Sequence, residues 1–269
     1  MAKSKVELFY DKQASRYSPT DFSPSNPTYD LYFADEISWH LLKKYVPKKK
    51  SCFILEAGAG TGDWSIQFAK LGYKNIVLAD ISRGMLNQAQ EKFSKLNRRV
   101  NAQFIKADIT DMKGLESDTF EYVFSQYDAV SYCLRPQQAI TELARVTKRH
   151  AHIVVTLDTK YRRVPEFIGR GQIKKAQQLL KSNISHEFGH PQYNLTWEEL
   201  AKCFEQAGLE VVEVIGAPVF VHHVNKRVEK RLRMNPKTRA ILLRIELDNC
   251  TNRSLVNFAG HLQMVGRKS

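Results

Sequence analysis

Three glycines and two acids in one short stretch carry the clearest chemical signal in the chain. Gly58, Gly60 and Gly62 occupy every second position, Glu56 lies two positions before them, and Asp63 follows directly. Glycine lets the backbone turn sharply and lets a ligand approach the main chain closely. The dinucleotide fingerprint needs a glycine where Asp63 stands, and acids on both sides of the turn disfavour a pyrophosphate. The stretch therefore favours a cationic or zwitterionic ligand.

The elements that must position this turn can be inferred from the spacing of apolar residues. Residues 53–57 are mostly apolar or small and predict a buried strand, whereas apolar side chains recur at helical spacing from Trp64 to Leu71. The start of that helix presents unpaired N–H groups and the positive end of its dipole to the turn. A second strand over 76–79 ends in Asp80, where a carboxylate can accept hydrogen bonds from both hydroxyls of a ribose.

Together with later segments, this pattern resembles the class I, Rossmann-like S-adenosylmethionine-dependent methyltransferases, small-molecule type. The matching segments are 56–62 (EAGAGTG), 78–89 (LADISRGMLNQA), 104–109 (FIKADI) and 120–125 (FEYVFS), in the family's order and spacing. The resemblance is good over residues 6–160 and looser to the end of the chain, where 260–268 is similar to the family's last strand. It implies an α/β, doubly wound, mostly parallel seven-stranded sheet with helices on both faces. It also implies S-adenosyl-L-methionine as the cofactor.

The same resemblance implies a set of cofactor-binding residues. They are Tyr17, Glu56, Gly58, Gly60, Gly62, Asp80, Ile81, Met85, Asp108, Ile109 and Gln126. Tyr17 would close over the cofactor, Met85 would flank the adenine, and Asp108 would accept a bond from the adenine amino group. Simpler alternatives stay open: aromatic packing for Tyr17, ordinary core packing for Met85, and a helix cap for Asp108.

The chain is expected to be a single domain over 1–269, because no linker-like run of proline, glycine or serine interrupts it. We divide it into an N-terminal helical lid (1–50), a cofactor-binding core (51–157) and two substrate-side insertions (158–195 and 224–253). The remaining strands are expected over 103–107, 120–125, 152–157, 209–215 and 262–265. The first insertion contains no clean strand pattern, and an insertion of this length in a compact fold is usually a binding lid.

A sulfonium carries an excellent leaving group, so catalysis of methyl transfer can depend mainly on placing donor and acceptor in line. Such positioning can account for roughly 7–11 kcal/mol of the barrier. A base is needed only where the acceptor must lose a proton. His186 and His190 in the first insertion are the candidate bases. Tyr127 and Asp128, at the carboxyl end of the fourth strand, are expected to bind the substrate and are the alternative bases. No metal site is expected, because no third ligand accompanies the His222–His223 pair.

The formal net charge is +13, and the second insertion holds the densest group of Lys and Arg residues. Such a balance favours an anionic partner, although a solvated amphipathic helix pair explains the second insertion more simply. We expect a small-molecule acceptor, with an anionic one favoured by the charge. An RNA or protein methyltransferase is the alternative, although the fourth strand ends in Ser-Gln-Tyr-Asp, unlike the Asn/Asp-Pro-Pro-Tyr of base amino methylases. A third possibility is a non-catalytic binding module of the same fold. Nothing favours it, because neither the glycine turn nor Asp80 departs from the family's pattern.

Four scattered cysteines (Cys52, Cys133, Cys203 and Cys250) form no C-x-x-C pair, so free thiols in a reducing cytoplasm are expected. No apolar run approaches the ~20 residues that a membrane helix needs, and the first residues lack the apolar segment of a signal peptide. We therefore expect a cytoplasmic protein with no membrane partner.

Overall fold

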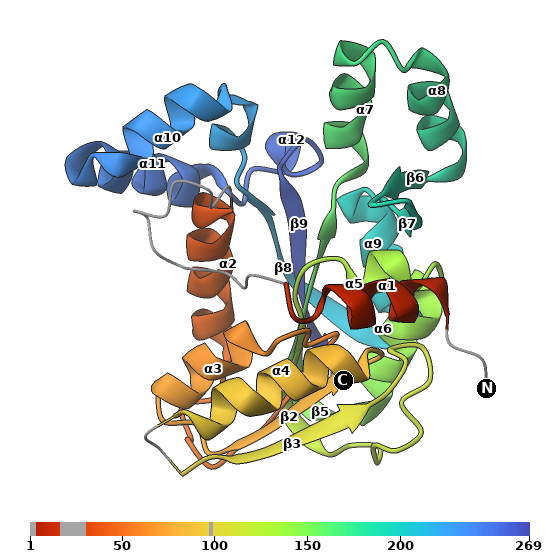
Figure 1. Cartoon of the computed structure of the whole chain (residues 1–269), viewed down its shortest axis with the longest axis vertical. Helices are drawn as coiled ribbons and strands as arrows, with labels where there is room; N and C mark the ends of the chain where they lie inside the picture. The colour runs from red at the N-terminus through yellow and green to blue at the C-terminus, as the bar shows by residue number, and fades with distance from the viewer. Residues whose placement is uncertain (1–3, 17–30, 97–98) are drawn as a thin grey trace.

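The computed structural model describes residues 4–16, 31–96 and 99–269. The strands of its central sheet are β1 (Phe53–Ala57), β2 (Asn75–Asp80), β3 (Asn101–Lys106), β4 (Phe120–Ser125), β5 (Thr147–Asp158), β8 (Leu209–Ala217) and β9 (His261–Lys268). They lie in the order β3-β2-β1-β4-β5-β9-β8. β9 is antiparallel to both of its neighbours, and the other pairs are parallel. The expected fold class is confirmed (Figure 1).

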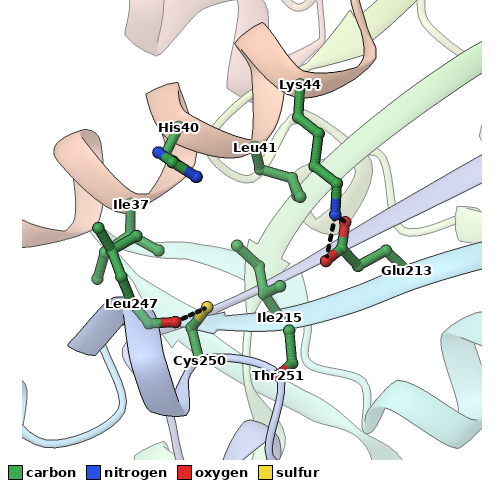
Figure 2. A pocket seen from close by; sticks show the side chains of 9 residues that line it. All are labelled: Ile37, His40, Leu41, Lys44, Glu213, Ile215, Leu247, Cys250 and Thr251. Atoms are coloured by element: carbon green, nitrogen blue, oxygen red, sulfur yellow. Dashed lines mark hydrogen bonds and ion pairs between the residues drawn. The ribbon is translucent and has the colours of Figure 1, made fainter. Parts of the chain in front are cut away.

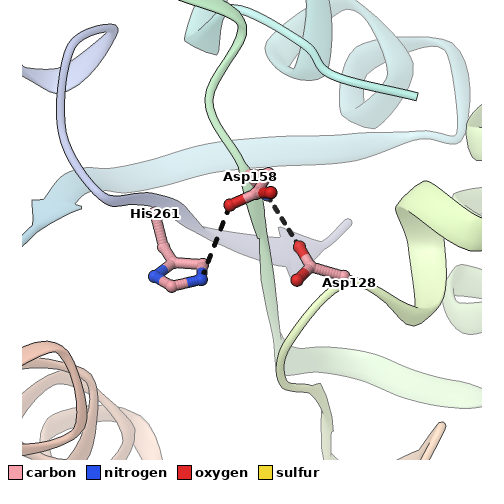
Figure 3. A group of neighbouring side chains, drawn as sticks. All are labelled: Asp128, Asp158 and His261. Atoms are coloured by element: carbon pink, nitrogen blue, oxygen red, sulfur yellow. Dashed lines mark hydrogen bonds and ion pairs between the residues drawn. The ribbon is translucent and has the colours of Figure 1, made fainter. Parts of the chain in front are cut away.

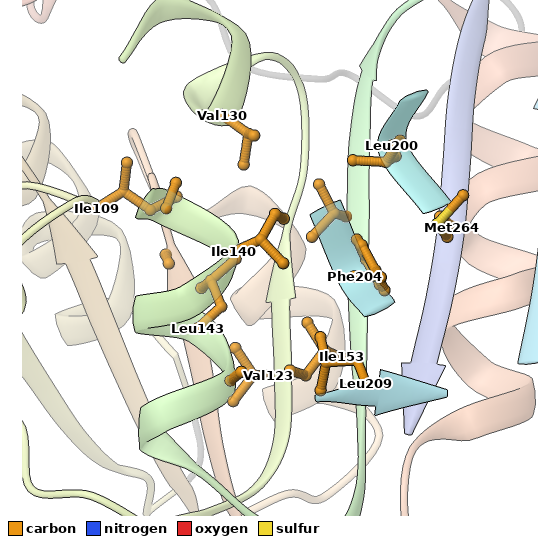
Figure 4. Packing of buried hydrophobic residues seen from close by; sticks show 14 of the residues in the cluster. Ile109, Val123, Val130, Ile140, Leu143, Ile153, Leu200, Phe204, Leu209 and Met264 are labelled. Atoms are coloured by element: carbon orange, nitrogen blue, oxygen red, sulfur yellow. The ribbon is translucent and has the colours of Figure 1, made fainter. Parts of the chain in front are cut away.

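Helices cover both faces of this sheet. One face carries α2 (Tyr32–Tyr45), α3 (Asp63–Lys70) and α4 (Arg83–Ser94), and the other carries α6 (Pro136–Val146) and α9 (Trp197–Gln206). Neighbouring residues of one strand feed opposite cores: Val123 packs with α6, whereas Tyr122 packs with α3. This follows from the two-residue period of a strand, and burial on both faces explains the nearly continuous apolar sequences. Figure 4 shows the α6–α9 core, with Leu143 and Phe204 facing the sheet.

Three additions, namely the N-terminal helix and two insertions, lie around the carboxyl ends of the parallel strands. α1 (Lys5–Gln13) crosses the end of α4, and α5 (Ala129–Tyr132) follows β4. The insertion after β5 holds α7 (Lys160–Gly169), α8 (Ile173–Ser182) and the hairpin of β6 (Ile184–Glu187) and β7 (His190–Tyr193). The insertion after β8 holds a short 3₁₀ turn (Val221–His223), α10 (Lys226–Met234), α11 (Pro236–Asn249) and α12 (Arg253–Val256). Both insertions project from the same end of the molecule (Figure 1).

The β6–β7 hairpin corrects the expectation that the first insertion has no clean strand. Phe188 and Gly189 both have positive φ, at 49° and 80°, as a tight two-residue hairpin turn requires. The strands carry polar rather than alternating apolar residues, and buried Ser185 donates a 2.6 Å hydrogen bond to Asn194. A search for alternating apolar residues therefore misses them. No helix in the described ranges is long and apolar enough to span a bilayer.

Candidate active site

The glycine turn joins the end of β1 to the start of α3, and its three glycines all have positive φ. A Cβ on Gly58 would lie 2.3 Å from the Cβ of Ala129, and a Cβ on Gly62 would lie 2.7 Å from Leu78 Cδ2. At Gly60 a Cβ would meet no described atom within 4 Å. Gly58 and Gly62 therefore serve close packing, whereas the main chain at Gly60 faces open space that a ligand could fill.

Asp80 ends β2 beside this open face. Its Oδ2 accepts a 2.8 Å bond from the Gly60 N–H, and its Oδ1 accepts a 2.8 Å bond from the Ser82 N–H. Desolvation raises the pKa of Asp80, and these two backbone donors oppose the shift. Each oxygen keeps a second lone pair, so the carboxylate can still accept hydrogen bonds from a ligand.

The N-terminal helix α1 is fastened next to Asp80. Asp11 Oδ1 accepts bonds from Ser82 Oγ at 2.6 Å and from the Gly84 N–H at 3.0 Å. Ser82 also caps α4 by accepting a bond from the Met85 N–H. A Cβ on Gly84 would lie 3.2 Å from the Asp11 carbonyl oxygen, so a glycine there permits the close approach of α1. Tyr17 lies outside the described residues.

The two acids around the turn carry less free charge than the sequence suggests. Glu56 is 2% exposed, accepts bonds from both the N–H and Oγ of Ser65, and has its pKa raised by burial to about 8. Asp63 forms a 2.8 Å ion pair with Lys92. Glu56 is therefore mostly protonated near neutral pH and Asp63 is already paired, so the two acids disfavour a pyrophosphate less than expected from the sequence.

The other residues expected around an adenine lie just after β2 and β3 and in the first turn of α4. Met85 and Ile109 are buried, and Ile81 is half-buried. Asp108 Oδ1 accepts bonds from the N–H and Oγ1 of Thr110, at 2.8 and 2.7 Å, and its Oδ2 lies 3.6 Å from Arg135. Asp108 thus stabilises its own turn, while its side chain stays 40% exposed.

Gln126, directly after β4, has an unsatisfied amide. Its Oε1 accepts a 2.9 Å bond from Thr156 Oγ1, and its Nε2 is buried without a partner among the described residues. A buried donor left unpaired costs about 1–3 kcal/mol. A ligand with an acceptor group at this point would remove that cost, so the residues present fit a bound polar ligand.

Tyr127 links the glycine turn to the far side of the site. Its hydroxyl donates a short hydrogen bond to Asp35 of α2, and its ring lies 6.0 Å from the Trp64 ring and 5.0 Å from the His261 ring, centroid to centroid. Asp35 is fully buried, and burial raises its pKa well above the usual range. Asp35 was not among the site residues expected from the sequence.

A buried polar group lies at the carboxyl ends of β4 and β5 (Figure 3). Asp158 and His261 are cross-strand partners on β5 and β9, and His261 Nε2 lies 3.6 Å from Asp158 Oδ1. The Asp158 N–H donates a 2.8 Å bond to Asp128 Oδ1. Arg162 and Arg163 of α7 each form a 2.6 Å ion pair with the Asp158 carboxylate. This arrangement brings two helices and three strands to one point.

The charge states within this group differ. Burial alone would raise the pKa of Asp158, but Arg162 and Arg163 hold it well below its usual range. Burial and the Asp158 charge raise the pKa of Asp128 well above its usual range. Burial lowers the pKa of His261 to about 4. The two guanidinium groups therefore favour the ionised form of Asp158, whereas burial and the Asp158 charge favour the protonated form of Asp128. His261, with a pKa of about 4, is neutral at neutral pH.

These three side chains could reach a common metal ion, since their ligand atoms lie within 4.8 Å of one another. The donor set does not suit a cation, however. Two guanidinium groups already pair with Asp158, and burial disfavours the ionised form of Asp128 that would bind a cation. His261 Nδ1 is buried with no partner among the described residues, which leaves one neutral nitrogen lone pair or N–H available to a bound molecule.

The candidate bases His186 and His190 lie on the β6–β7 hairpin rather than in this group. His186 is exposed, and the ring of half-buried His190 packs against Phe9 of α1 at 4.8 Å. Their neighbour Glu187 instead reaches inward and pairs with Arg163. Asp158 could have been found from the sequence as an acid at a strand end, like Asp80, whereas no local signal marks His261.

A small cavity between described side chains lies away from the glycine turn (Figure 2). It has a volume of about 120 Å³ and lies between α2, α11 and β8. Its lining is mostly apolar, with Lys44 and Glu213 forming a 2.7 Å ion pair at one side. None of the candidate site residues described above lines it.

Comparison with known proteins agrees with this geometry. Residues 54–150 match a family model described as a methyltransferase domain. The ubiquinone/menaquinone biosynthesis C-methyltransferase of Campylobacter jejuni is 31% identical over 156 residues, which make up 52% of this chain and 62% of that protein. The chain thus spans less than two thirds of that curated relative.

Two solved structures share the fold across almost the whole chain. One is a chain of the complex between the Haloferax volcanii Trm112 methyltransferase activator and a methyltransferase, with a TM-score of 0.62, 15% identity, and 99% of both chains covered. The other is the cyclase SpnF, with a TM-score of 0.63, 15% identity, and 98% and 96% of the two chains covered. At such identities the likeness concerns the fold alone. The family match agrees with the resemblance seen in the sequence: residues 54–150 are similar to a methyltransferase domain, and the solved structures share the Rossmann-like α/β fold that carries it.

Proposed function

We propose that this protein transfers a methyl group from S-adenosyl-L-methionine to a small-molecule acceptor. The observation that carries the proposal is the open main chain at Gly60, held by the Asp80 carboxylate within a methyltransferase domain. S-adenosyl-L-methionine would supply an activated methyl group there. The alternative dinucleotide ligand is disfavoured because the third glycine stands one position too early for the fingerprint.

In this proposal the chain's residues divide the cofactor between them. Asp80 accepts hydrogen bonds from the ribose, and the apolar side chains of Ile81 and Met85 border the adenine. The exposed oxygen of Asp108 accepts a bond from the adenine amino group. The unpaired Nε2 of Gln126 donates to the amino-acid part of the cofactor, which would satisfy the buried donor.

Glu56 and the glycine turn would hold the same amino-acid part from the other side. A cationic ammonium near Glu56 favours the ionised carboxylate. Ligand binding is therefore expected to release the proton that burial holds on Glu56 at neutral pH. Ile109 would support the adenine border from the core, where it is already buried. Tyr17 remains a proposed lid residue.

For the acceptor side we propose Tyr127 and Asp128 as substrate contacts and His261 as the base. His261 is neutral at physiological pH, and its Nδ1 has no protein partner. Asp158 lies close enough to the other ring nitrogen to orient the imidazole and to stabilise the imidazolium once a proton is taken. His186 and His190 lack such a partner arrangement, so we rank them below His261.

A base at this position suits an acceptor that must lose a proton, such as a hydroxylated ring. The similarity to a quinone-biosynthesis C-methyltransferase favours ring compounds of that kind as the first acceptors to assay. The Lys and Arg residues of the second insertion favour an anionic acceptor, which is a further prediction. We also propose that residues 1–269 work as one domain, because α1 is hydrogen-bonded to α4 and both insertions are held by buried polar contacts. The cytoplasm is the proposed location.

Calorimetry with S-adenosylhomocysteine tests the cofactor part. Asp80→Ala is expected to abolish measurable binding, and an unchanged affinity would remove the assignment of Asp80. Incubation with S-adenosyl-L-methionine and a metabolite extract, followed by mass spectrometry, then identifies the species that gains a methyl group. Failure of any species of small mass to gain one, with transfer to RNA or protein instead, would favour the alternative acceptor class.

The base assignment is tested by comparing His261→Asn with His186→Asn on the identified acceptor. Loss of a general base costs about 10²–10⁴ in kcat, so that loss is expected for His261→Asn and not for His186→Asn. Because the pKa of His261 is about 4, the acid limb of wild-type kcat/KM should lie well below pH 6. Equal rates for the wild type and His261→Asn would exclude the role.

A further inference from the structure

The two insertions end in paired helices whose outer faces are both basic and apolar. We call residues 160–182 (α7 and α8) the first arm and residues 226–249 (α10 and α11) the second arm. Together with the segments flanking them, the insertions hold most of the large apolar side chains that are exposed in the described chain. These are Ile168, Ile173, Leu180, Phe188, Phe220, Val224, Val228, Met234, Ile241, Ile245 and Phe258. Scattered exposed apolar residues are ordinary, but such a concentration marks a contact surface.

The second arm shows the arrangement most clearly. On α11, Ile241 and Ile245 lie one turn apart and are 63% and 43% exposed. On α10, the exposed side chains of Arg227, Lys230 and Arg231 have no acidic partner among the described residues. The outer surface of this arm therefore combines an apolar row with free cationic groups.

The inner basic residues of the same arm are already used by the fold. Arg233 is 1% exposed and forms a 2.9 Å ion pair with Glu229. Glu246 of α11 accepts backbone hydrogen bonds from Val219 and Val221. These inner charged groups thus have a role in the fold. The cationic groups of the outer face have no such role, so their presence needs another explanation.

The first arm repeats the pattern on α8. Ile173 and Leu180 are two turns apart on the exposed side, at 51% and 47% exposure, and Lys174 and Lys181 flank them without acidic partners in the described residues. On the inner side, Arg162 and Arg163 are bound to Asp158. Beyond α8, the turn of the β6–β7 hairpin exposes the ring of Phe188.

Both arms extend from the end of the molecule where the parallel strands have their carboxyl ends (Figure 1). From this placement we infer that the arms dock the protein onto an anionic lipid bilayer surface. Their cationic groups would lie among the lipid headgroups, and their apolar rows would enter the interface. A peripheral contact of this kind needs no spanning helix. The inference departs from the expectation of no membrane partner, which rested on the absence of such a helix.

An anionic bilayer fits these surfaces better than a nucleic acid does. Phosphate groups of RNA would satisfy the cationic side chains but would leave Ile241, Ile245, Ile173 and Leu180 in water. A lipid interface accepts both kinds of group at once. Docking does not depend on the proposed function. If that function also holds, the acceptor is expected to be an amphiphile reached at the bilayer surface.

Co-sedimentation with vesicles tests the inference on the full chain. The vesicles contain either equal amounts of phosphatidylcholine and phosphatidylglycerol or phosphatidylcholine alone. The wild type is expected to sediment with the mixed vesicles and to remain in solution with the neutral ones. Since each Lys or Arg near such a surface contributes about a fivefold change in partitioning, Arg227→Gln/Lys230→Gln/Arg231→Gln should bind the mixed vesicles about a hundredfold more weakly.

Two further variants separate local contact from total charge. Lys48→Gln/Lys49→Gln/Lys70→Gln removes the same charge from exposed positions near the amino ends of the parallel strands, opposite the arms. This variant should keep the wild-type partitioning within a few-fold. Ile241→Gln/Ile245→Gln leaves the charge unchanged and should weaken binding at least tenfold. Melting temperatures close to that of the wild type establish that each variant is folded.

Three results would overturn the inference. They are no sedimentation of the wild type with the mixed vesicles, equal losses for the two charge variants, and full binding by Ile241→Gln/Ile245→Gln. Salt-sensitive retention of bulk RNA by the wild type, without vesicle binding, would assign the arms to nucleic acid instead. S-adenosylhomocysteine affinity is measured on the same preparations, so a failure of docking is distinguishable from a failure of the proposed function.

Discussion

Replacing Gly60 with alanine separates the binding role of the glycine turn from its packing role. Gly60 and Gly58 both have positive φ, at 50° and 73°. Alanine in that region costs about 1–2 kcal/mol. At Gly60 the new Cβ meets no described atom within 4 Å, whereas at Gly58 it would lie 2.3 Å from the Ala129 Cβ. The two substitutions share backbone strain and differ in what the added methyl group meets.

The expected sizes follow from that difference. Gly60→Ala should lower the free energy of unfolding by about 1–2 kcal/mol, from strain alone. Gly58→Ala adds an overlap in a close-packed region, worth about 1–3 kcal/mol, so its total should be roughly 2–5 kcal/mol. Ligand binding should be affected at Gly60, although its cost in stability is smaller, because there the added methyl group occupies the space proposed for the cofactor. A steric cost of about 1.4 kcal/mol or more would weaken binding at least tenfold.

Urea denaturation measures the first quantity and calorimetry with S-adenosylhomocysteine the second. Gly72→Ala is the matched control, because Gly72 has a φ of 91°, also faces no described atom within 4 Å, and lies at the far end of α3 from the turn. It should lose stability as Gly60→Ala does and keep the wild-type affinity. If Gly60→Ala and Gly72→Ala bind S-adenosylhomocysteine equally well, the open face at Gly60 is not the cofactor site.

Three other substitutions test individual contacts. Burial raises the pKa of Glu56 to about 8. Its protonated form therefore contributes stability that is full below about pH 4 and is lost as the pH rises through 8. In urea denaturation, Glu56→Gln should gain stability relative to the wild type as the pH rises from 5 to 9. Asp11→Ala removes the bonds that fasten α1 to α4 and should speed proteolysis of the N-terminal helix; unchanged proteolysis would show that other contacts hold α1. Gly266→Ala places a Cβ 2.6 Å from Phe204 Cδ1 and should cost about 1–3 kcal/mol of unfolding free energy with S-adenosylhomocysteine affinity retained.

Local patterns were sufficient for the fold and for the position of the glycine turn and Asp80 at one end of the sheet. The apolar period of each strand and helix is written in a few consecutive residues, and so is the glycine turn. Glu56, Gly60 and Asp80 could therefore be placed from the sequence, because a strand followed by a turn fixes them at one edge of a parallel sheet. The polar β6–β7 hairpin was missed because its strands are stabilised by buried side-chain hydrogen bonds around Ser185, not by an apolar alternation.

The proposed acceptor side depended on contacts between distant parts of the chain. Asp158 and His261 meet because β9 inserts antiparallel beside β5, and Tyr127 meets Asp35 because α2 packs over the sheet. The electrostatics of the acids followed the same rule. The sequence contains Asp128 and Asp158, but it is burial that raises the pKa of Asp128, and it is the two arginines of α7 that hold the pKa of Asp158 below its usual range. Residue type and spacing are properties of the chain, whereas desolvation and long-range pairing exist only once the chain is packed.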